Sequence, residues 1–193
     1  KNFAQKNNIK NVNFVNADIF DDVLNKNTFD FIWCNGVLHH TRDPQNAFKI
    51  ILKSLKKDGF IVIGLYNKIG RIRTLVRKYF YKIFGRKFLF LFDPVLRKIK
   101  KNSQEQTNAW IRDQYHHPVE SLHTFDEILK WFEINDVEFI NSIPSCDILS
   151  KDENFFSKTN SETFVERFLS QFFMIFSALG SDGGLFVIIG KKK

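Results

Sequence analysis

The five histidines of this 193-residue chain fall into two groups, and their side chains are the ones best suited to proton transfer. His39 and His40 are adjacent, whereas His116, His117 and His123 lie close together much later in the chain. A histidine can act as a general base, as a group that positions a substrate, or as a helix cap. For the first pair we favour a structural or positioning role. No third ligand follows it at a spacing suited to a metal ion, so we expect no metal site.

The later histidines belong to an unusually polar run that begins at Gln114. Its candidates for catalytic residues, either as contacts to a substrate or as a base, are Tyr115, His116, His117 and His123. The alternative is that these side chains only cap and pack a loop. The residues alone leave both interpretations open.

The elements that must position these side chains begin with a strand, a helix and a second strand. Phe29–Trp33 is a short apolar run typical of a strand, and Phe60–Leu65 is a nearly continuous one typical of a strand covered on both faces. Between them, Asp43-Pro44 predicts the start of a helix, and basic residues before Gly59 predict its end. A strand, a crossover helix and a parallel strand make a βαβ unit.

Other apolar patterns predict the remaining elements. Further strands are expected at Val12–Val15, at Val137–Ile140 and at 184–190. Helices are expected over 69–84, over 88–99 with a break at Asp93-Pro94, over 125–132, and over 164–179 with an end at Gly180. We expect the last of these helices to pack against the first.

The βαβ unit also resembles a known family. Leu38-His39-His40, Asp43-Pro44 and Leu55–Gly59 stand in the order found in the second half of class I S-adenosylmethionine-dependent methyltransferases. Asp58 replaces the usual first glycine of the turn. The resemblance implies an α/β fold, a Rossmann-like three-layer sandwich with helical lid insertions, in which the family's strands 3 to 7 are present. The family's sheet order is 3-2-1-4-5-7-6, with strand 7 antiparallel.

The resemblance implies S-adenosyl-L-methionine as the cofactor. Asp18 matches an acidic residue that hydrogen-bonds the adenine amino group, and Ile19 lies beside it for apolar contact with the ring. Alternatively, Asp18 only caps a turn. The loop that passes under the cofactor is matched by Asn35, Gly36 and Val37, and His40, which follows, is expected to contribute.

Tyr66 and Asn67 end the second strand of the unit, at the edge where open α/β sheets bind ligands. We expect these two residues, together with Tyr115, to contact the substrate. The implied reaction is methyl transfer to a nucleophilic O, N or C atom, which asks mainly for proximity and alignment. Because the sulfonium of the cofactor is cationic, the ring of Tyr66 or Tyr115 could stabilise it.

The glycine-rich turn that follows strand 1 in this family is missing, since no G-x-G-x-G occurs in the chain. We therefore expect strands 1 and 2 upstream of Lys1, which makes this chain an N-terminally truncated fragment that is inactive alone. We divide it into a partial methyltransferase core at 1–67, a basic helical insertion or lid at 68–104, and the rest of the core at 105–193 with a second helical insertion near 160–180.

The first insertion allows three interpretations. It is a lid whose apolar face packs on the domain, an interfacial helix that approaches a membrane, or a basic surface for RNA. Its aromatic residues follow core periodicity rather than a stacking platform, which counts against RNA. We favour a small-molecule or lipid-like acceptor. An RNA methyltransferase and a non-catalytic Rossmann-like binding module are the alternatives.

Composition narrows the class of protein. The net charge is +8, which permits binding to nucleic acid or to an anionic membrane surface without requiring it. Cys34 and Cys146 lie far apart and outside any disulfide or zinc spacing, which fits a cytoplasmic protein. No uninterrupted apolar run reaches the roughly 18 residues of a membrane span.

Overall fold

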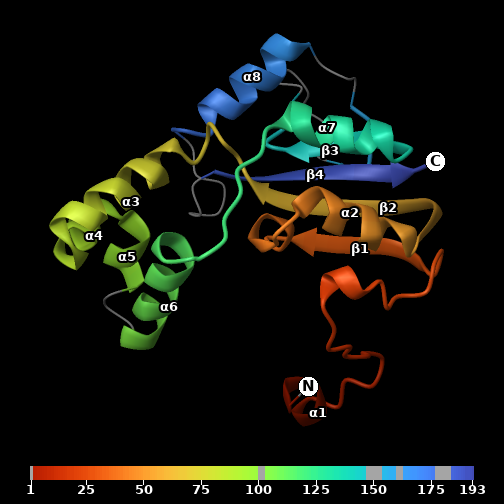
Figure 1. Cartoon of the computed structure of the whole chain (residues 1–193), viewed down its shortest axis with the longest axis horizontal. Helices are drawn as coiled ribbons and strands as arrows, with labels where there is room; N and C mark the ends of the chain where they lie inside the picture. The colour runs from red at the N-terminus through yellow and green to blue at the C-terminus, as the bar shows by residue number, and fades with distance from the viewer. Residues whose placement is uncertain (1, 100–102, 147–153, 160–162, 177–183) are drawn as a thin grey trace.

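The computed structural model describes residues 2–99, 103–146, 154–159, 163–176 and 184–193. Its sheet has four strands in the order β1-β2-β4-β3: β1 is Phe29–Asn35, β2 is Leu55–Tyr66, β3 is Val137–Ile143 and β4 is Leu185–Lys192. β1 and β2 are parallel, whereas β4 runs antiparallel to both β2 and β3 (Figure 1). This is the order 4-5-7-6 that the resemblance implies.

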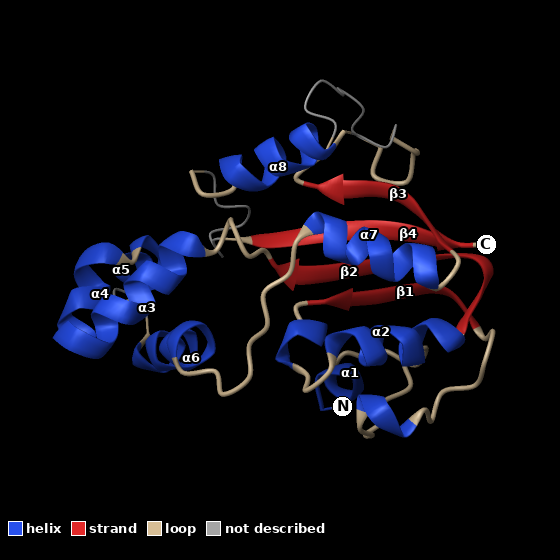
Figure 2. Ribbon diagram, turned by 45° about the horizontal axis from the view of Figure 1, so that its top comes forward, coloured by secondary structure: helices blue, strands red, loops and turns tan. Residues whose placement is uncertain are grey.

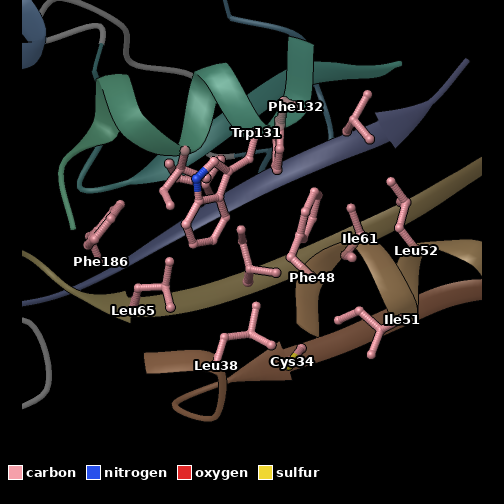
Figure 3. Packing of buried hydrophobic residues seen from close by; sticks show 14 of the residues in the cluster. Cys34, Leu38, Phe48, Ile51, Leu52, Ile61, Leu65, Trp131, Phe132 and Phe186 are labelled. Atoms are coloured by element: carbon pink, nitrogen blue, oxygen red, sulfur yellow. The ribbon is translucent and has the colours of Figure 1, made fainter. Parts of the chain in front are cut away.

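Two amphipathic helices cover one face of this sheet. Helix α2, Pro44–Lys53, begins at Asp43, whose Oδ1 accepts a hydrogen bond from the Asn46 amide at 3.1 Å. Helix α7, Phe125–Ile134, is capped by Thr124. The ring of Phe48 on α2 stacks on Phe132 of α7 with centroids 5.7 Å apart, in the main hydrophobic core (Figure 3). Burial of these faces is the main force that holds both helices on the sheet.

The opposite face of the sheet has a smaller apolar cluster, formed by Val62, Ile140 and Ile189. On the same face, the β1 residues Phe31 and Trp33 are exposed, and their rings lie 6.5 Å apart. Cys34 points into the main core, and burial raises the pKa of its thiol to about 11. Cys34 is thus a small core residue, as predicted.

The strand expected at Val12–Val15 is not formed. The N-terminal part of the chain contains the short helix α1, Asn2–Lys6, and the 3-10 turn η1, Ile19–Asp21, with irregular backbone between them. In the family's sheet order, strand 3 pairs with strand 2 and not with the strand that β1 represents. Without a neighbouring strand to accept its hydrogen bonds, an apolar run of this length gains nothing from an extended ladder.

The helix of the βαβ unit ends earlier than predicted. α2 stops at Lys53, Ser54 forms its C-cap, and Gly59 lies inside β2 rather than after the helix. Asp58 takes a positive φ of 62°, and the register with β1 shifts between Phe29 and Phe31. The basic residues before Gly59 therefore form a bulged start to the strand.

Four helices follow β2 and lie off the carboxyl ends of β1 and β2 (Figure 2). They are α3, Ile72–Phe84; α4, Arg86–Phe92; α5, Pro94–Ile99; and α6, Gln104–Tyr115. They have their own core of Leu89, Leu96, Ile111 and Tyr115. This unit continues past the predicted boundary at 104, because α6 completes its core. Its apolar stripe on α3 is exposed, so it is not a lid with that face packed on the domain.

Helix α8, Phe164–Phe173, packs beside α7. Arg167 pairs with Asp126 on α7 at 2.6 Å, and Gln171 accepts a hydrogen bond from the side chain of Asn67 at 2.9 Å. Its aromatic row, including Phe168 and Phe172, is exposed rather than buried against the first insertion. The predicted end at Gly180 lies outside the described residues. Within the described part of the chain, no helix is both long and apolar enough to cross a bilayer.

Asp93 holds the four-helix unit together. Its Oδ1 caps α5 by accepting hydrogen bonds from the amides of Val95 and Leu96 at 2.8 and 3.2 Å. Its Oδ2 accepts from the Tyr115 hydroxyl at 2.7 Å and from Trp110 Nε1 at 3.0 Å. The carboxylate is 1% exposed, so these four bonds replace its contacts with water.

We expect Asp93→Ala to destabilise the protein by about 3 kcal/mol, because it uncaps α5 and leaves the buried Tyr115 hydroxyl and the partly buried Trp110 N–H unpaired. Tyr115→Phe removes only one of the four bonds and is expected to cost about 1 kcal/mol. Urea unfolding followed by circular dichroism measures both values. Equal stabilities for Asp93→Ala and the wild-type protein would contradict this role.

Candidate functional site

A cavity of about 320 Å³ lies where β1 and β2 end, beside α6. This is the edge at which open α/β sheets bind ligands. The strands and the loops after them supply one part of its wall, and α6 supplies another. The residues that line it are Asn35, Gly36, His40, Tyr66, Trp110, Asp113, Gln114 and Leu185.

The floor of the cavity combines an open glycine with an unpaired acceptor. Gly36 has a φ of +76°, and a Cβ built there would meet nothing within 4 Å, so the backbone is open to a ligand. Asn35 Oδ1 is buried and has no hydrogen-bond partner among the described residues. Such an acceptor is expensive to bury unless a donor reaches it. The site thus favours a ligand with an N–H or O–H group.

Arg71 fixes the wall formed by Tyr66. Its guanidinium lies 3.4 Å from the centroid of the Tyr66 ring, and its Nη1 donates to Gln114 Oε1 at 3.1 Å. Gln114 Nε2 in turn donates to the Tyr66 hydroxyl at 3.0 Å and to Asp113 Oδ2 at 2.7 Å. Burial raises the pKa of the Tyr66 hydroxyl, although the charge of Arg71 opposes this. The Tyr66 side chain is therefore held neutral and in one orientation.

Glu120 balances the buried charge of Arg71. Arg71 Nε lies 2.8 Å from Glu120 Oε1, and Nη2 lies 3.2 Å from Oε2, so the pair is bidentate. Burial by itself would raise the pKa of Glu120. The hydrogen bond and charge of Arg71, with a contribution from Lys78, outweigh it and hold that pKa below its ordinary value. Glu120 is thus ionised wherever the fold is intact at neutral pH.

His39 is a core residue. It is 1% exposed, its ring lies 4.1 Å from those of His40 and Tyr66, and neither of its nitrogens has a partner within the described structure. Burial, followed by the charges of His40 and Arg71, lowers its pKa to about 3. A neutral, buried imidazole outside the cavity lining fits the predicted structural role.

His40 faces the cavity, and its tautomer follows from its neighbours. Its Nδ1 lies 3.0 Å from the carbonyl oxygen of Val119, which can only accept, so the neutral ring has its proton on Nδ1. Nε2 is then the acceptor nitrogen. The ring of His117 stacks on His40 at 3.7 Å, and its Nδ1 donates to the same carbonyl at 2.6 Å.

The other predicted catalytic residues lie apart from the cavity lining. His116 is exposed, and its Nε2 bonds to the Tyr81 hydroxyl at 2.7 Å. His123 is buried between Ser121 Oγ at 2.8 Å and Glu127 Oε1 at 2.9 Å. Tyr115 lies in the core of the four-helix unit, where burial and the bond to Asp93 raise the pKa of its hydroxyl. None of these four candidates lines the cavity, but two lie next to residues that do: His117 stacks on His40, and the amide of His123 donates to the carbonyl of Tyr66 at 2.9 Å.

The predicted cofactor and substrate residues divide between two places. Asn35, Gly36, His40 and Tyr66 meet at the cavity, with Val37 exposed beside it. Asn67 is fully buried, and its Oδ1 accepts from the amides of Ile69 and Gly70 at 2.9 Å each, so it shapes the turn after β2.

Asp18 and Ile19 line a separate cavity of about 280 Å³, which is also bounded by Ile50 and Ile51 of α2. The Asp18 carboxylate accepts from the Phe20 amide at 2.9 Å and forms a capping box with Asp21. Asp18 therefore does cap a turn, as the alternative interpretation of the sequence proposed, and it also borders an apolar cavity. The guanidinium of Arg71 already covers one face of the Tyr66 ring, and Tyr115 lies in the core of the four-helix unit. Both placements disfavour the predicted contact of these rings with the sulfonium of the cofactor.

Sequence reasoning missed the residues that organise the site, namely Arg71, Trp110, Asp113, Gln114 and Glu120. Arg71 is one of many basic residues between Lys68 and Lys101, and nothing in its local pattern separates it from exposed neighbours. Asp113, Gln114 and Glu120 lie in the polar stretch of the later histidines, but the sequence assigned them no role. The roles of these residues can be recognised only from contacts in the folded structure.

We expect Arg71→Met to cost about 4 kcal/mol, because it leaves the Glu120 carboxylate buried without its partner. Adding Glu120→Gln removes that charge, so the double variant is expected to be more stable than Arg71→Met alone. Arg112→Met, at an exposed arginine on α6, serves as the control and is expected to change stability by less than about 0.5 kcal/mol. Strictly additive unfolding free energies for the two changes would rule out the coupling.

Acidification provides a test of His39. Its pKa is lower in the folded state than the ordinary 6.5, so the unfolded chain binds more protons between about pH 3 and 6.5. The stability contribution of neutral His39 is complete above pH 6.5 and declines as the pH falls towards 3, by at most about 1.4 kcal/mol per pH unit. His39→Leu should therefore flatten the pH dependence of the unfolding free energy. Identical slopes at pH 5 to 7 for both proteins would refute a neutral buried histidine.

Comparison with known proteins identifies the family to which the chain belongs. The sequence model of a methyltransferase domain family matches residues 1–136. A curated protein of Synechococcus sp., described as uncharacterized, is 26% identical over 149 residues, which cover 67% of this chain and 36% of that protein. The chain thus spans little more than a third of the length of that relative.

Solved structures agree in fold. PKMT2 from Rickettsia typhi superposes with a TM-score of 0.66 at 14% identity, over 100% of this chain and 40% of that one. The complex of PKMT2 with AdoHcy gives a TM-score of 0.65 at 12% identity, over 98% of this chain and 40% of that one. The family match covers more than half of the chain, and the strand order agrees with it. The chain belongs to the methyltransferase domain family and has the Rossmann-like fold of class I S-adenosylmethionine-dependent methyltransferases.

Proposed function

We propose that this protein transfers a methyl group from S-adenosyl-L-methionine to a small-molecule or lipid-like acceptor. The observation that carries the proposal is the cavity at the carboxyl ends of β1 and β2, whose wall is completed by Trp110, Asp113 and Gln114 of the helical insertion. A cavity walled by strand ends and an inserted helix encloses a ligand better than the bare sheet edge does. Methyl transfer is the activity of the family to which the chain belongs.

The residues present fit parts of the cofactor. The unpaired Oδ1 of Asn35 would accept from a cofactor N–H or O–H group, and the open backbone at Gly36 would allow close approach. The second cavity has apolar walls and two carboxylates, Asp18 and Asp22, of which Asp22 is paired with Lys53. The apolar walls and the carboxylate of Asp18 suit a planar base with an exocyclic amino group. When bound, the cofactor supplies an electrophilic methyl group.

His40 is the residue that we assign to proton removal from the acceptor. It lines the cavity, and the bond from its Nδ1–H to the Val119 carbonyl leaves Nε2 as the basic nitrogen. His117 stacks on its ring and holds it in place. His39 is too deeply buried to serve, and His116 and His123 are engaged elsewhere.

The lining also bears on the acceptor. Asp113 and Gln114 supply polar groups at one side, while Trp110 and Leu185 supply apolar surface. This mixture suits a small molecule with one polar group next to an apolar body, which supports the small-molecule or lipid-like class.

Isothermal titration of the protein with S-adenosylmethionine and S-adenosylhomocysteine tests the cofactor assignment. We expect both compounds to bind, with low affinity because this chain has no glycine-rich turn. Gly36→Val, which places a β-branched residue at positive φ on the cavity floor, is expected to weaken binding at least about tenfold. Ile134→Val, at an exposed site on α7, is the control.

Absence of binding for both compounds would overturn the methyltransferase proposal. Unchanged affinity in a folded Gly36→Val variant would show that the cofactor does not use this cavity.

A further inference from the structure

Helices α3 and α4 present an apolar stripe to solvent. On α3, Ile72, Val76, Tyr79, Ile83 and Phe84 recur at helical spacing and are between 47% and 64% exposed. On α4, Leu91 and Phe92 continue the stripe and are 65% and 53% exposed. A stripe of this kind normally packs on a core, and a large exposed patch marks an interaction surface.

The stripe is a continuous surface with a groove in it. The rings of Phe80, Phe84, Phe88 and Phe92 follow one another from α3 to α4, with centroids 4.5 to 6.0 Å apart. A groove of about 510 Å³ runs beside them, and its lining is Ile72, Arg73, Val76, Arg77, Phe80, Phe88 and Phe92. Two arginines thus line an otherwise apolar groove. Arg77 Nη2 donates to Thr74 Oγ1 at 3.0 Å and its Nη1 lies 4.0 Å from Asp93 Oδ1, whereas its Nε is buried with no hydrogen-bond partner among the described residues.

The exposed charges on the segment from α3 to α5 all have one sign. Between residues 72 and 99 the only acidic residue is Asp93, which is buried and engaged with Tyr115 and Trp110. The basic side chains of the same segment are Arg73, Arg77, Lys78, Lys82, Arg86, Lys87, Arg97 and Lys98. Two of them face buried carboxylates, since Arg77 lies 4.0 Å from Asp93 and Lys78 lies 3.9 Å from Glu120. An apolar stripe flanked only by cations is complementary to a surface that has an apolar interior and anionic groups at its boundary.

We propose that the α3–α4 face docks on an anionic lipid bilayer, with the apolar stripe in the interface and the flanking cations at the phosphates. A second copy of the chain fits less well, because a symmetric contact would bring the same cations together. An RNA partner fits less well too, because Ile72, Val76, Ile83 and Leu91 offer no flat rings for bases. Figure 1 shows α3 and α4 at the end of the molecule farthest from the C-terminus, clear of the sheet.

The face lies on the same helical unit that supplies Trp110 and Gln114 to the cavity. Docking would therefore bring the cavity close to the membrane surface. Only the use of that cavity for methyl transfer at the membrane rests on the proposed function. Binding to lipid does not require the cofactor, so the two proposals fail separately.

Vesicle flotation of the protein, without cofactor, tests the docking. We expect binding to vesicles of phosphatidylcholine with phosphatidylglycerol, weak binding to pure phosphatidylcholine, and release at high salt. Val76→Glu with Ile83→Glu should abolish binding. Lys82→Gln and Arg86→Gln should each weaken it about fivefold, the equivalent of about 1 kcal/mol per cation near an anionic surface.

Ile134→Glu and Lys26→Glu are matched controls at exposed positions outside the face, and they should bind vesicles like the wild-type protein. Thermal unfolding of every variant checks that the fold is retained. Absence of wild-type binding to anionic vesicles, or equal binding by the Val76/Ile83 variant, would overturn the proposal. So would a wild-type dimer that this variant converts to a monomer while neither protein binds vesicles, since the stripe would then join two copies.

Discussion

The structure around the candidate site depends on one buried cation. Arg71 has no exposed surface, and a guanidinium removed from water is stable only when its charge and its donors are matched. Glu120 supplies the charge, Gln114 accepts one donor, and the ring of Tyr66 covers its face. These three residues come from a loop, from α6 and from the end of β2. Satisfying one side chain therefore fixes the position of the helical insertion relative to the sheet.

The ion pair between Arg71 and Glu120 also explains how His39, His40 and His117 are oriented. The loop that places Glu120 next to Arg71 also brings the Val119 carbonyl within reach of His40 and His117. Ser121 in the same loop donates to the His39 carbonyl, from its amide at 2.9 Å and from its hydroxyl at 3.2 Å. One short segment thus orients the ring that faces the cavity. The chemistry assigned to His40 follows from an ion pair in which it takes no part.

Sequence reasoning succeeded where the signals are local. The cap at Asp43, the proline after it and the apolar spacing of α2 lie within a few residues of one another, and together they predicted the βαβ unit. The strand order followed from the family resemblance and is confirmed. The strand expected at Val12–Val15 failed because a strand is defined by its neighbour. The end of α2 was misplaced because Gly59 serves the close packing of β2 against Asp30 rather than a helix cap.

For the site, the chain positions near strand ends were predictable, and Asn35, Gly36, His40 and Tyr66 do meet there. The residues that complete the cavity were not predictable. The burial of Arg71, which holds them in place, depends on Gln114 and Glu120, 43 and 49 positions away in the chain. Spacing along one helix cannot distinguish it from an exposed arginine such as Arg73. The apolar periodicity of α3 was recognised correctly, but periodicity does not say whether a face meets protein or another medium.

Asn35 and Gly64 are register partners on β1 and β2, and a Cβ added at Gly64 would lie 1.7 Å from Asn35 Oδ1. The amide of Asn35 occupies the volume that a side chain at position 64 would need. The two positions therefore cannot vary independently in evolution. A homologue that acquires a side chain at position 64 must turn aside or shorten the residue at position 35, and either change would remove the amide oxygen from its place at the cavity.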